Sequence, residues 1–231
     1  METKCLDYIE INPVGQPSAC VIWLHGLGAD GNDFAGIVPE LRLPQTLNVR
    51  FVLPHAPYRP ITRNQGHVMR GWYDIAQISV PMREDKAGLD ASTELLDILI
   101  QQEMQQGIDS RRIILAGFSQ GCALALHAGL RYPKPLGGII ALSGYLPLTS
   151  TLSRTEHTAN AATPIFMAHG DADDVIALPI AELSHKALLD QGYDVAWHLY
   201  KMAHSVSVPE ISDIAAWIVK TLEAKPAMRI R

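Results

Sequence analysis

The sequence has few cysteines, few aromatic residues and no excess of positive charge. Its 231 residues include three cysteines, Cys5, Cys20 and Cys122, and aromatic side chains make up 6% of the chain. An odd cysteine count in a chain long enough to fold without cross-links argues against a disulfide framework, so we expect reduced thiols. Lys and Arg number 19 against 24 Asp and Glu, which gives a net charge of −5. Nucleic-acid-binding proteins need a broad basic surface, so we expect no nucleic-acid partner.

The sequence also lacks the marks of an export signal and of a membrane anchor. Residues 1–8 contain neither the basic region nor the apolar region of a secretory signal peptide. The most apolar stretch, residues 113–130, approaches the length of a membrane-spanning helix. Its middle, however, contains Gly117 and Gly121 around polar residues, which favours a buried strand that turns into a helix. We therefore expect a cytoplasmic protein without stable membrane insertion.

Apolar residues are plentiful and arranged in short runs. They make up 48% of the chain, and at about 150 residues per domain the length favours one domain over residues 1–231. Apolar runs that are mostly rich in Val and Ile, and mostly followed by Gly or Pro, predict buried strands. These runs lie at residues 20–24, 49–53, 112–116, 138–142 and 164–168. Because helical patterns lie between several of them, we predict an α/β fold with a mostly parallel central sheet and helices on both faces.

The helical patterns and the later part of the chain add detail to this prediction. An apolar stripe at Ala91, Leu95, Ile98 and Leu99 predicts a helix that ends near Gly107.

Three further segments complete the outline. Residues 195–200 alternate as a half-exposed strand does, and Ser207 and Glu210 form a capping box at the start of the last helix. Two long segments, 54–87 and 143–163, break the alternation of strands and helices. Long irregular loops in a compact domain are often binding loops, so we expect these two to shape the substrate groove.

The segment Gly117-Phe118-Ser119-Gln120-Gly121 matches the pattern Gly-x-Ser-x-Gly. In this nucleophile elbow, a tight strand-to-helix turn presents the serine hydroxyl above the sheet, and the small neighbours make the turn sterically feasible. The context fits, because a strand pattern precedes Ser119 and an apolar helical pattern follows it. Ser119 is therefore the candidate nucleophile.

A serine hydroxyl needs a histidine base and a carboxylate that orients this base, in the chain order Ser, acid, His. The predicted strand that ends at residue 168 is followed by Asp171, Asp173 and Asp174 in one turn. The strand at 195–200 is followed by His204, directly before the last helix. His204 is therefore the candidate base, whereas the spacing alone leaves the choice among the three carboxylates open.

Acyl transfer also needs two hydrogen-bond donors for the negative charge that develops on the carbonyl oxygen. The backbone N–H of Gln120, the residue after the serine, is the expected first donor. The second is expected from the glycine-rich segment 24–31, which directly follows the first buried strand.

Beyond these features, motifs along nearly the whole chain resemble the phospholipase/carboxylesterase branch of the α/β-hydrolases. This family includes bacterial carboxylesterases and acyl-protein thioesterases. Each motif is weak alone, but their shared order is specific. The motifs are Leu24-His25-Gly26-Leu27-Gly28 with Asp33-Phe34, Pro54-His55-Ala56-Pro57 with Arg59-Pro60, Gly71-Trp72-Tyr73-Asp74, the elbow, Leu142-Ser143-Gly144-Tyr145-Leu146-Pro147, His169-Gly170-Asp171-x-Asp173 and His204-Ser205.

The resemblance implies an α/β-hydrolase fold and a catalytic triad of Ser119, Asp173 and His204, with no metal and no cofactor. It thereby selects Asp173, the residue three after the glycine of His-Gly-x-x-Asp. Two positions depart from the family pattern. Cys122 and Ala203 stand where the family often has glycine. Cys122 we expect to be a packing residue, because free cysteine is commonly buried.

The resemblance further implies where substrate binds. The backbone N–H groups of Leu27 and Gln120 would form the oxyanion hole, and the side chains of Leu27 and Trp72 would contact the acyl chain. Relatives often form dimers, which makes a homodimer an expectation for this chain.

The function that these features predict is a serine carboxylesterase for short- to medium-chain acyl esters, which acts through an acyl-enzyme on Ser119. The substrate would be a small-molecule ester or an acyl-thioester, since an acyl-protein thioesterase or a lysophospholipase would use the same triad. Two alternatives lie outside this class. Residues 171–175 fit the Asp-x-Asp-x-Val pattern of haloacid-dehalogenase-type phosphotransferases, and a hydrolase fold can serve as a non-catalytic binding module.

Overall fold

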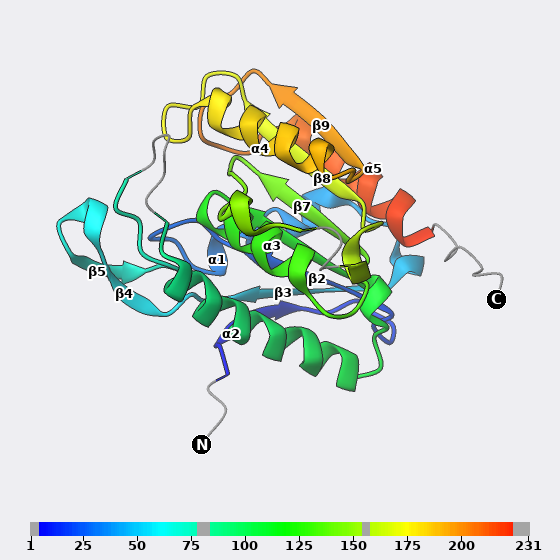
Figure 1. Ribbon diagram of the computed structural model, residues 1–231. Helices are drawn as coiled ribbons and strands as arrows, with labels where there is room; N and C mark the ends of the chain where they lie inside the picture. Colours follow the sequence, from blue (N-terminus) through cyan, green and yellow to red (C-terminus); the bar gives the residue numbers. More distant parts are fainter. Residues whose placement is uncertain (1–4, 78–83, 154–157, 224–231) are drawn as a thin grey trace.

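The computed structural model describes residues 5–77, 84–153 and 158–223 and centres on a seven-stranded sheet (Figure 1). The strands lie in the order β1, β3, β2, β6, β7, β8, β9, and β1 is the antiparallel member. Their bounds are Tyr8–Ile11 (β1), Ala19–Leu24 (β2), Val49–Pro54 (β3), Ile113–Phe118 (β6), Gly138–Leu142 (β7), Ile165–Gly170 (β8) and Val195–Tyr200 (β9). All the predicted strands are present in this sheet.

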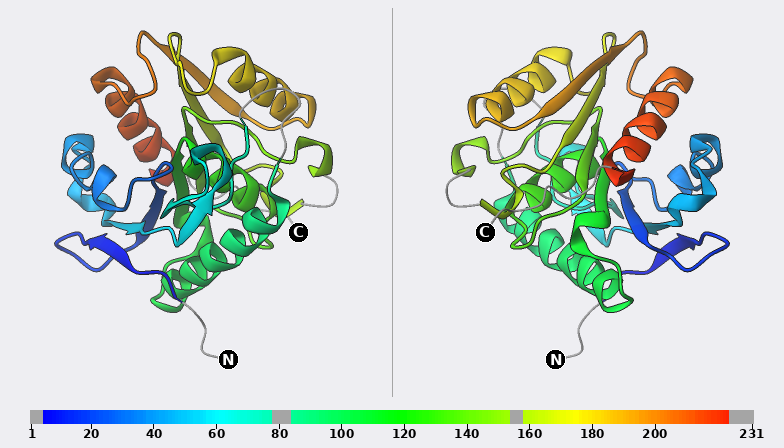
Figure 2. Two further views of the ribbon diagram at one scale, coloured as in Figure 1. Left: turned by 90° about the vertical axis from the view of Figure 1, so that its left-hand side faces the viewer. Right: turned by 90° about the vertical axis from the view of Figure 1, so that its right-hand side faces the viewer.

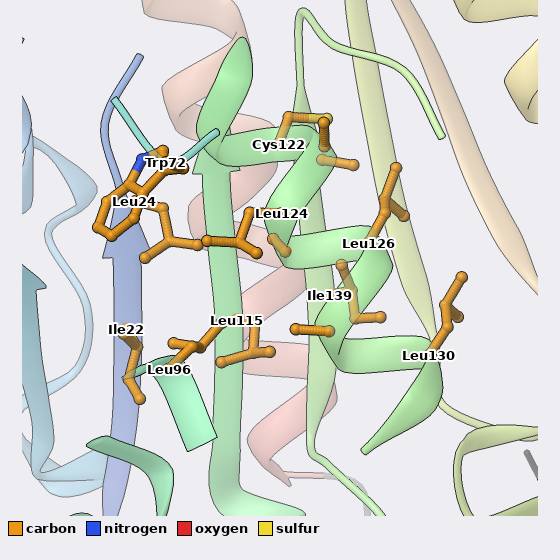
Figure 3. Close-up of a cluster of buried hydrophobic side chains, with 14 of the residues drawn as sticks. Ile22, Leu24, Trp72, Leu96, Leu115, Cys122, Leu124, Leu126, Leu130 and Ile139 are labelled. Carbon is orange, nitrogen blue, oxygen red and sulfur yellow. The ribbon is translucent and has the colours of Figure 1, made fainter. Parts of the chain in front are cut away.

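Helices cover both faces of the sheet, as predicted (Figure 2). On one face, α2 (Lys86–Gln105), α3 (Gln120–Arg131) and α4 (Leu178–Asp190) bury a core that includes Leu24, Leu115 and Leu124 (Figure 3). On the other face, α1 (Asn32–Ala35) and α5 (Val208–Glu223) pack on a second core that includes Phe34 and Ile214. The central strands are therefore buried on both sides, which explains their continuous apolar sequences.

The apolar stretch 113–130 forms β6, a turn and α3. All residues of α3 from Gln120 to Leu130 are buried. No helix in the described ranges is both long enough and apolar enough to cross a membrane. A helix enclosed by the core is apolar on all sides for the same reason as a spanning helix, and its length distinguishes the two.

Two details of the sequence prediction are wrong. The stripe that we predicted for α2 has the wrong phase, because Ala91 is exposed while Leu89, Ser92 and Leu96 are buried. Residues 54–87 are not irregular throughout, since they contain the antiparallel hairpin of β4 (Tyr58–Ile61) and β5 (His67–Arg70). The strand β4 contains Pro60, which is tolerated because both strands of a two-stranded hairpin are edge strands.

The strand β9 was predicted to be half-exposed, and it is: Leu199 is 47% exposed and the other residues are half-buried. This strand is at the edge of the sheet, where both faces are only partly covered.

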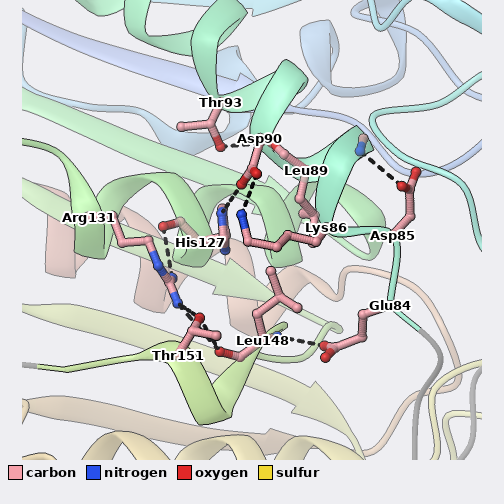
Figure 4. A network of polar contacts seen from close by, with 11 residues as sticks. Glu84, Asp85, Lys86, Leu89, Asp90, Thr93, His127, Arg131, Leu148 and Thr151 are labelled. Carbon is pink, nitrogen blue, oxygen red and sulfur yellow. Dashed lines mark hydrogen bonds and ion pairs between the residues drawn. The ribbon is translucent and has the colours of Figure 1, made fainter.

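The segment after β7 is anchored on Arg131, at the end of α3, and on Glu84, just before α2 (Figure 4). The guanidinium of Arg131 donates to the Thr151 hydroxyl at 2.9 Å, and the carboxylate of Glu84 accepts from the Leu148 backbone N–H at 2.6 Å. His127 lies 3.8 Å from Asp90, but burial lowers the pKa of His127 to about 4. Because the His127 ring is neutral at pH 7, this pair is a polar contact and not an ion pair.

The capping box predicted at the start of α5 is present. The Ser207 backbone N–H donates to Oε2 of Glu210 at 3.1 Å, and the Glu210 N–H donates to the Ser207 hydroxyl at 3.3 Å. The Glu210 side chain is fully buried, and its Oε1 has no hydrogen-bond partner among the described residues. Burial, the largest cause, raises the pKa of Glu210 from 4.5 to about 7.

This raised pKa predicts a pH-dependent effect of Glu210→Gln. In the folded protein the Glu210 carboxyl holds its proton longer than in the unfolded chain, so its contribution to stability is complete below pH 4.5 and is lost as the pH rises through about 7. We expect Glu210→Gln, which cannot ionise, to raise the free energy of unfolding by about 2 kcal/mol at pH 8 and to leave it nearly unchanged at pH 4.5. Urea unfolding at both pH values measures this difference, and an equal effect at both would contradict the raised pKa.

Candidate active site

Ser119 lies in a tight turn between β6 and α3. Its backbone has φ +55° and ψ −116°, a conformation that residues other than glycine rarely adopt. The turn is held by the Ser119 N–H, which donates to the Leu142 carbonyl at 2.9 Å. A Cβ at Gly117 would lie 2.1 Å from the carbonyl oxygen of Gly121, so glycine is needed there because backbone approaches backbone. The elbow predicted from the sequence is therefore present.

The imidazole of His204 faces the Ser119 hydroxyl. His204 follows β9, and its Nε2 lies 2.9 Å from Oγ of Ser119. Its ring packs against Phe118, with 4.8 Å between the ring centroids. The side chain is 15% exposed, so the base is held by packing while its edge remains open to solvent.

On the other side of the imidazole lies the carboxylate of Asp173, which is fully buried. Its Oδ2 is 2.7 Å from Nδ1 of His204, and its Oδ1 accepts from the N–H groups of Val175 and Ile176 at 2.9 and 2.8 Å. Asp171 and Asp174, the other candidates left open by the spacing, are both exposed. The structure thus brings Asp173, and neither neighbour, together with His204.

These contacts define the proton positions. A carboxylate only accepts hydrogen bonds, so Nδ1 of His204 carries the proton and Nε2 is free to accept the hydroxyl proton of Ser119. The arrangement is that of a nucleophile, a base and an orienting acid. In the ranges that the structure describes, no group of three or more His, Cys, Asp or Glu side chains is placed to hold a metal ion.

The two expected oxyanion donors flank the elbow. Gln120 is the first residue of α3, so its N–H has no partner within the helix. Leu27 lies in the loop after β2, next to Gly28, whose N–H donates to the Arg70 carbonyl at 2.8 Å. In the described part of the chain, neither the Leu27 N–H nor the Gln120 N–H donates to another protein atom. Both are available for a ligand.

Trp72, which we expected to contact the acyl chain, is fully buried. Its indole N–H donates to the His25 carbonyl at 2.9 Å, so an acyl chain cannot touch this ring unless the loop moves. Tyr73, Ile75 and Leu146, other apolar residues of the two long loops, are also core residues. By contrast, Leu27 is half-buried and accessible. The prediction for Trp72 is therefore wrong, because its polar contacts and packing belong to the interior.

Cys122 is a packing residue, as expected. It is fully buried, and burial raises the pKa of its thiol, which disfavours the reactive thiolate. A Cβ at Gly144 would lie 2.4 Å from Sγ of Cys122, so the segment after β7 packs closely on this sulfur.

Two buried histidines near the site were not found from the sequence. His169 donates from Nε2 to the Ile176 carbonyl at 2.8 Å, and the same nitrogen lies 3.4 Å from Oδ2 of Asp173. Burial lowers the pKa of His169, which keeps it neutral. His25 lies in the loop that follows β2 and carries Leu27 (residues 25–31, the oxyanion loop), where burial lowers its pKa to about 4. Both stand in motifs of the family resemblance and at or just after the ends of buried strands, but the sequence does not show which atoms their rings contact.

Comparisons with known proteins identify the family. The sequence profile described as Phospholipase/Carboxylesterase matches residues 8–222. An acyl-protein thioesterase 1 of Gibberella zeae is 41% identical over 219 residues, which cover 91% of this chain and 93% of that protein. The corresponding protein of Yarrowia lipolytica is 39% identical over 211 residues, or 89% of this chain and 93% of that protein.

A solved structure agrees with this result. The crystal structure of Zea mays acyl-protein thioesterase 2 superimposes with a TM-score of 0.85 at 29% identity and covers 94% of this chain and 99% of that chain. Fold, sequence profile and relatives therefore lead to one conclusion: the chain belongs to the phospholipase/carboxylesterase family of α/β-hydrolases and is a hydrolase of the serine esterase type.

Proposed function

We propose that the protein hydrolyses acyl esters through an acyl-enzyme on Ser119, with His204 as the base and Asp173 as the orienting acid. The observation that carries this proposal is the continuous path of hydrogen bonds from Oγ of Ser119 to His204, at 2.9 Å, and from His204 to Asp173, at 2.7 Å. Such a path makes a serine hydroxyl reactive at neutral pH.

The reaction proceeds in two acyl transfers. Oγ of Ser119 attacks the carbonyl carbon while Nε2 of His204 takes the hydroxyl proton, and the N–H groups of Leu27 and Gln120 bind the resulting oxyanion. The tetrahedral intermediate collapses, the bond to the leaving group breaks, and His204 gives its proton to the departing alcohol or thiol. Water then attacks the acyl-enzyme in the same way, which releases the carboxylic acid and restores the Ser119 hydroxyl.

The acyl chain we place over the half-buried side chains of Leu27 and Met69. Met69 lies on β5, and a Cβ at Gly28 would be 3.7 Å from its sulfur, so Met69 borders the oxyanion loop. Met69 of the first long segment thus borders the site, and Gly144 of the second lies beside Ser119, where an added Cβ would be 2.8 Å from the Ser119 carbonyl oxygen. Short- to medium-chain acyl groups suit the apolar surface of Leu27 and Met69.

A second candidate substrate is the thioester of an acylated protein. The relatives at 39% and 41% identity are named acyl-protein thioesterases, which favours this reading at least as much as the ester. The chemistry is shared, because the leaving group is a thiol in place of an alcohol. The ratio of kcat/KM for an S-octanoyl cysteine peptide to that for an octanoyl ester decides between the two.

Labelling with a fluorophosphonate tests the proposal. The reagent forms a bond from phosphorus to an activated serine oxygen with loss of fluoride, so we expect one adduct, on Ser119, together with complete loss of esterase activity. Peptide mass spectrometry locates the adduct, and heat-unfolded protein is the control that should not react. Activity with no adduct on Ser119 would overturn the assignment, and absence of both would favour a non-catalytic binding module.

The phosphotransferase alternative finds no support in the site. It requires Asp171 and Asp173 to act together, yet the Asp173 carboxylate is buried against His204 while Asp171 is exposed. A homodimer and a cytoplasmic location stay predictions.

A further inference from the structure

Trp72 connects the loop that carries Leu27 to the first residue of α3, Gln120, and so joins the two expected oxyanion donors. Its backbone N–H donates to Oε1 of Gln120 at 2.8 Å, and its indole N–H donates to the His25 carbonyl at 2.9 Å. Its own carbonyl accepts from the Ser92 hydroxyl on α2. Three separate elements thus meet at one fully buried residue. The His25 carbonyl alone satisfies the indole N–H. The contacts of the Trp72 backbone with Gln120 and Ser92 come in addition to this one.

At one end of this connection, His25 determines how the peptide between Gly26 and Leu27 is oriented. The Ala56 N–H donates to Nε2 of His25 at 3.0 Å, so the imidazole proton is on Nδ1, which donates to the Gly26 carbonyl at 2.7 Å. That carbonyl and the Leu27 N–H belong to the same planar peptide group, in which they point in opposite directions. Holding the carbonyl therefore directs the N–H of Leu27.

The imidazole can do this only while it is held in place. The pKa of His25, lowered to about 4 by burial, keeps the ring neutral in the tautomer just described at neutral pH. The indole N–H of Trp72 donates to the backbone carbonyl of His25, and the indole ring lies against the His25 imidazole, with 5.1 Å between the ring centroids.

At the other end of the connection, the Gln120 side chain forms hydrogen bonds with the backbone of Trp72 and Tyr73. Besides accepting from the Trp72 N–H, it donates from Nε2 to the Tyr73 carbonyl at 2.6 Å, and its side chain is buried. The backbone N–H of this same residue is the other expected donor. The path from one donor to the other therefore runs through Gln120, Trp72 and His25 without a gap.

We propose that Trp72 is a positioning residue, which holds the N–H groups of Leu27 and Gln120 in the relative positions needed to bind the oxyanion. The inference rests on the oxyanion hole of the proposed function. It predicts that loss of the indole N–H weakens binding of the transition state and leaves binding of the substrate unchanged. A side chain that merely filled the core would affect stability alone.

Trp72→Phe tests this, because phenylalanine keeps an aromatic ring and removes the indole N–H. Trp23→Phe is the matched control: Trp23 is equally buried, and its indole N–H has no partner among the described residues. We expect Trp72→Phe to lower kcat about 10- to 100-fold with KM changed less than about 2-fold, since one donor is then misplaced. Trp23→Phe should leave both constants unchanged.

Inhibitors separate positioning from general damage. Oγ of Ser119 adds to the carbonyl carbon of an octyl trifluoromethyl ketone while His204 takes the hydroxyl proton, which leaves an oxyanion on the former carbonyl oxygen. The matching secondary alcohol has no carbonyl and cannot react in this way. In Trp72→Phe, the Ki of the ketone should rise by the factor by which kcat falls, and that of the alcohol should stay constant. Equal changes for both inhibitors, or a wild-type kcat, would overturn the inference.

Two further measurements keep the result interpretable. If Trp72→Phe does not fold, Gln120→Met removes both contacts to the loop while it keeps the backbone N–H, and it should show the same separation of the two inhibitors. Fluorophosphonate labelling of the wild-type protein tests the function separately. A labelled Ser119 together with unchanged kinetics of Trp72→Phe would mean that the inference fails and the proposed function stands.

Discussion

Replacement of Asp173 by asparagine should lower kcat by about 10³- to 10⁴-fold, by analogy with serine proteases of the chymotrypsin type, in which the same change costs about 10⁴-fold. The reason lies in how the carboxylate is held. Two backbone N–H groups, from Val175 and Ile176, donate to Oδ1, so in the variant the amide oxygen must take this position. The amide NH₂ then faces Nδ1 of His204, where a donor meets a donor unless the imidazole changes tautomer. With its proton on Nε2, His204 cannot accept the proton of Ser119.

Asp171→Asn is the matched control for this variant. It makes the same chemical change two residues away, at an exposed side chain, and should leave kcat within about 2-fold of the wild-type value. Steady-state rates with an octanoyl ester measure both variants, and urea unfolding shows whether Asp173→Asn remains folded. A large loss in Asp171→Asn with a small one in Asp173→Asn would mean that the orienting acid has been misassigned.

Asp171 and Asp173 also mark the difference between what the sequence predicts and what only the folded structure determines. The order of serine, acid and histidine and the positions of the central strands are properties of short segments, and β2, β6 and β8 were found for this reason. The direction of a carboxylate is not a property of this kind. Asp171, Asp173 and Asp174 have the same local pattern, and only the N–H groups of the turn and the approach of His204 separate them.

The burial of Trp72 could not be predicted from the local sequence either. An aromatic residue next to a glycine in a long loop has one sequence signature, whether it lines a groove or fills the core. Its burial depends on the His25 carbonyl and the Gln120 side chain, which come from distant parts of the chain. The phase of α2 was missed for a related reason, since Ser92 is buried by its bond to the Trp72 carbonyl and not by its hydrophobicity.

The second large effect is expected for Gly121→Ala, in the first turn of α3. A Cβ at this position would lie 2.3 Å from the carbonyl oxygen of Leu24 and 2.7 Å from that of His25, and backbone atoms cannot rotate away as a side chain would. To relieve the contact, α3 and the end of β2 must separate by about 1 Å, which a packed core resists. We expect the free energy of unfolding to fall by about 3–5 kcal/mol, as measured by urea denaturation.

Gly121→Ala should also impair catalysis in the molecules that remain folded. Leu24 and His25 lead directly into the oxyanion loop, and Gln120 precedes the substituted residue, so the separation moves the two donors apart. Because a misplacement of about 1 Å can cost about 100-fold in rate, kcat per folded molecule should fall by at least that factor. Gly36→Ala is the control, since a Cβ there would meet no atom within 4 Å and φ is −71°. Unchanged kcat in Gly121→Ala would show that the distance between α3 and the loop after β2 does not control the oxyanion hole.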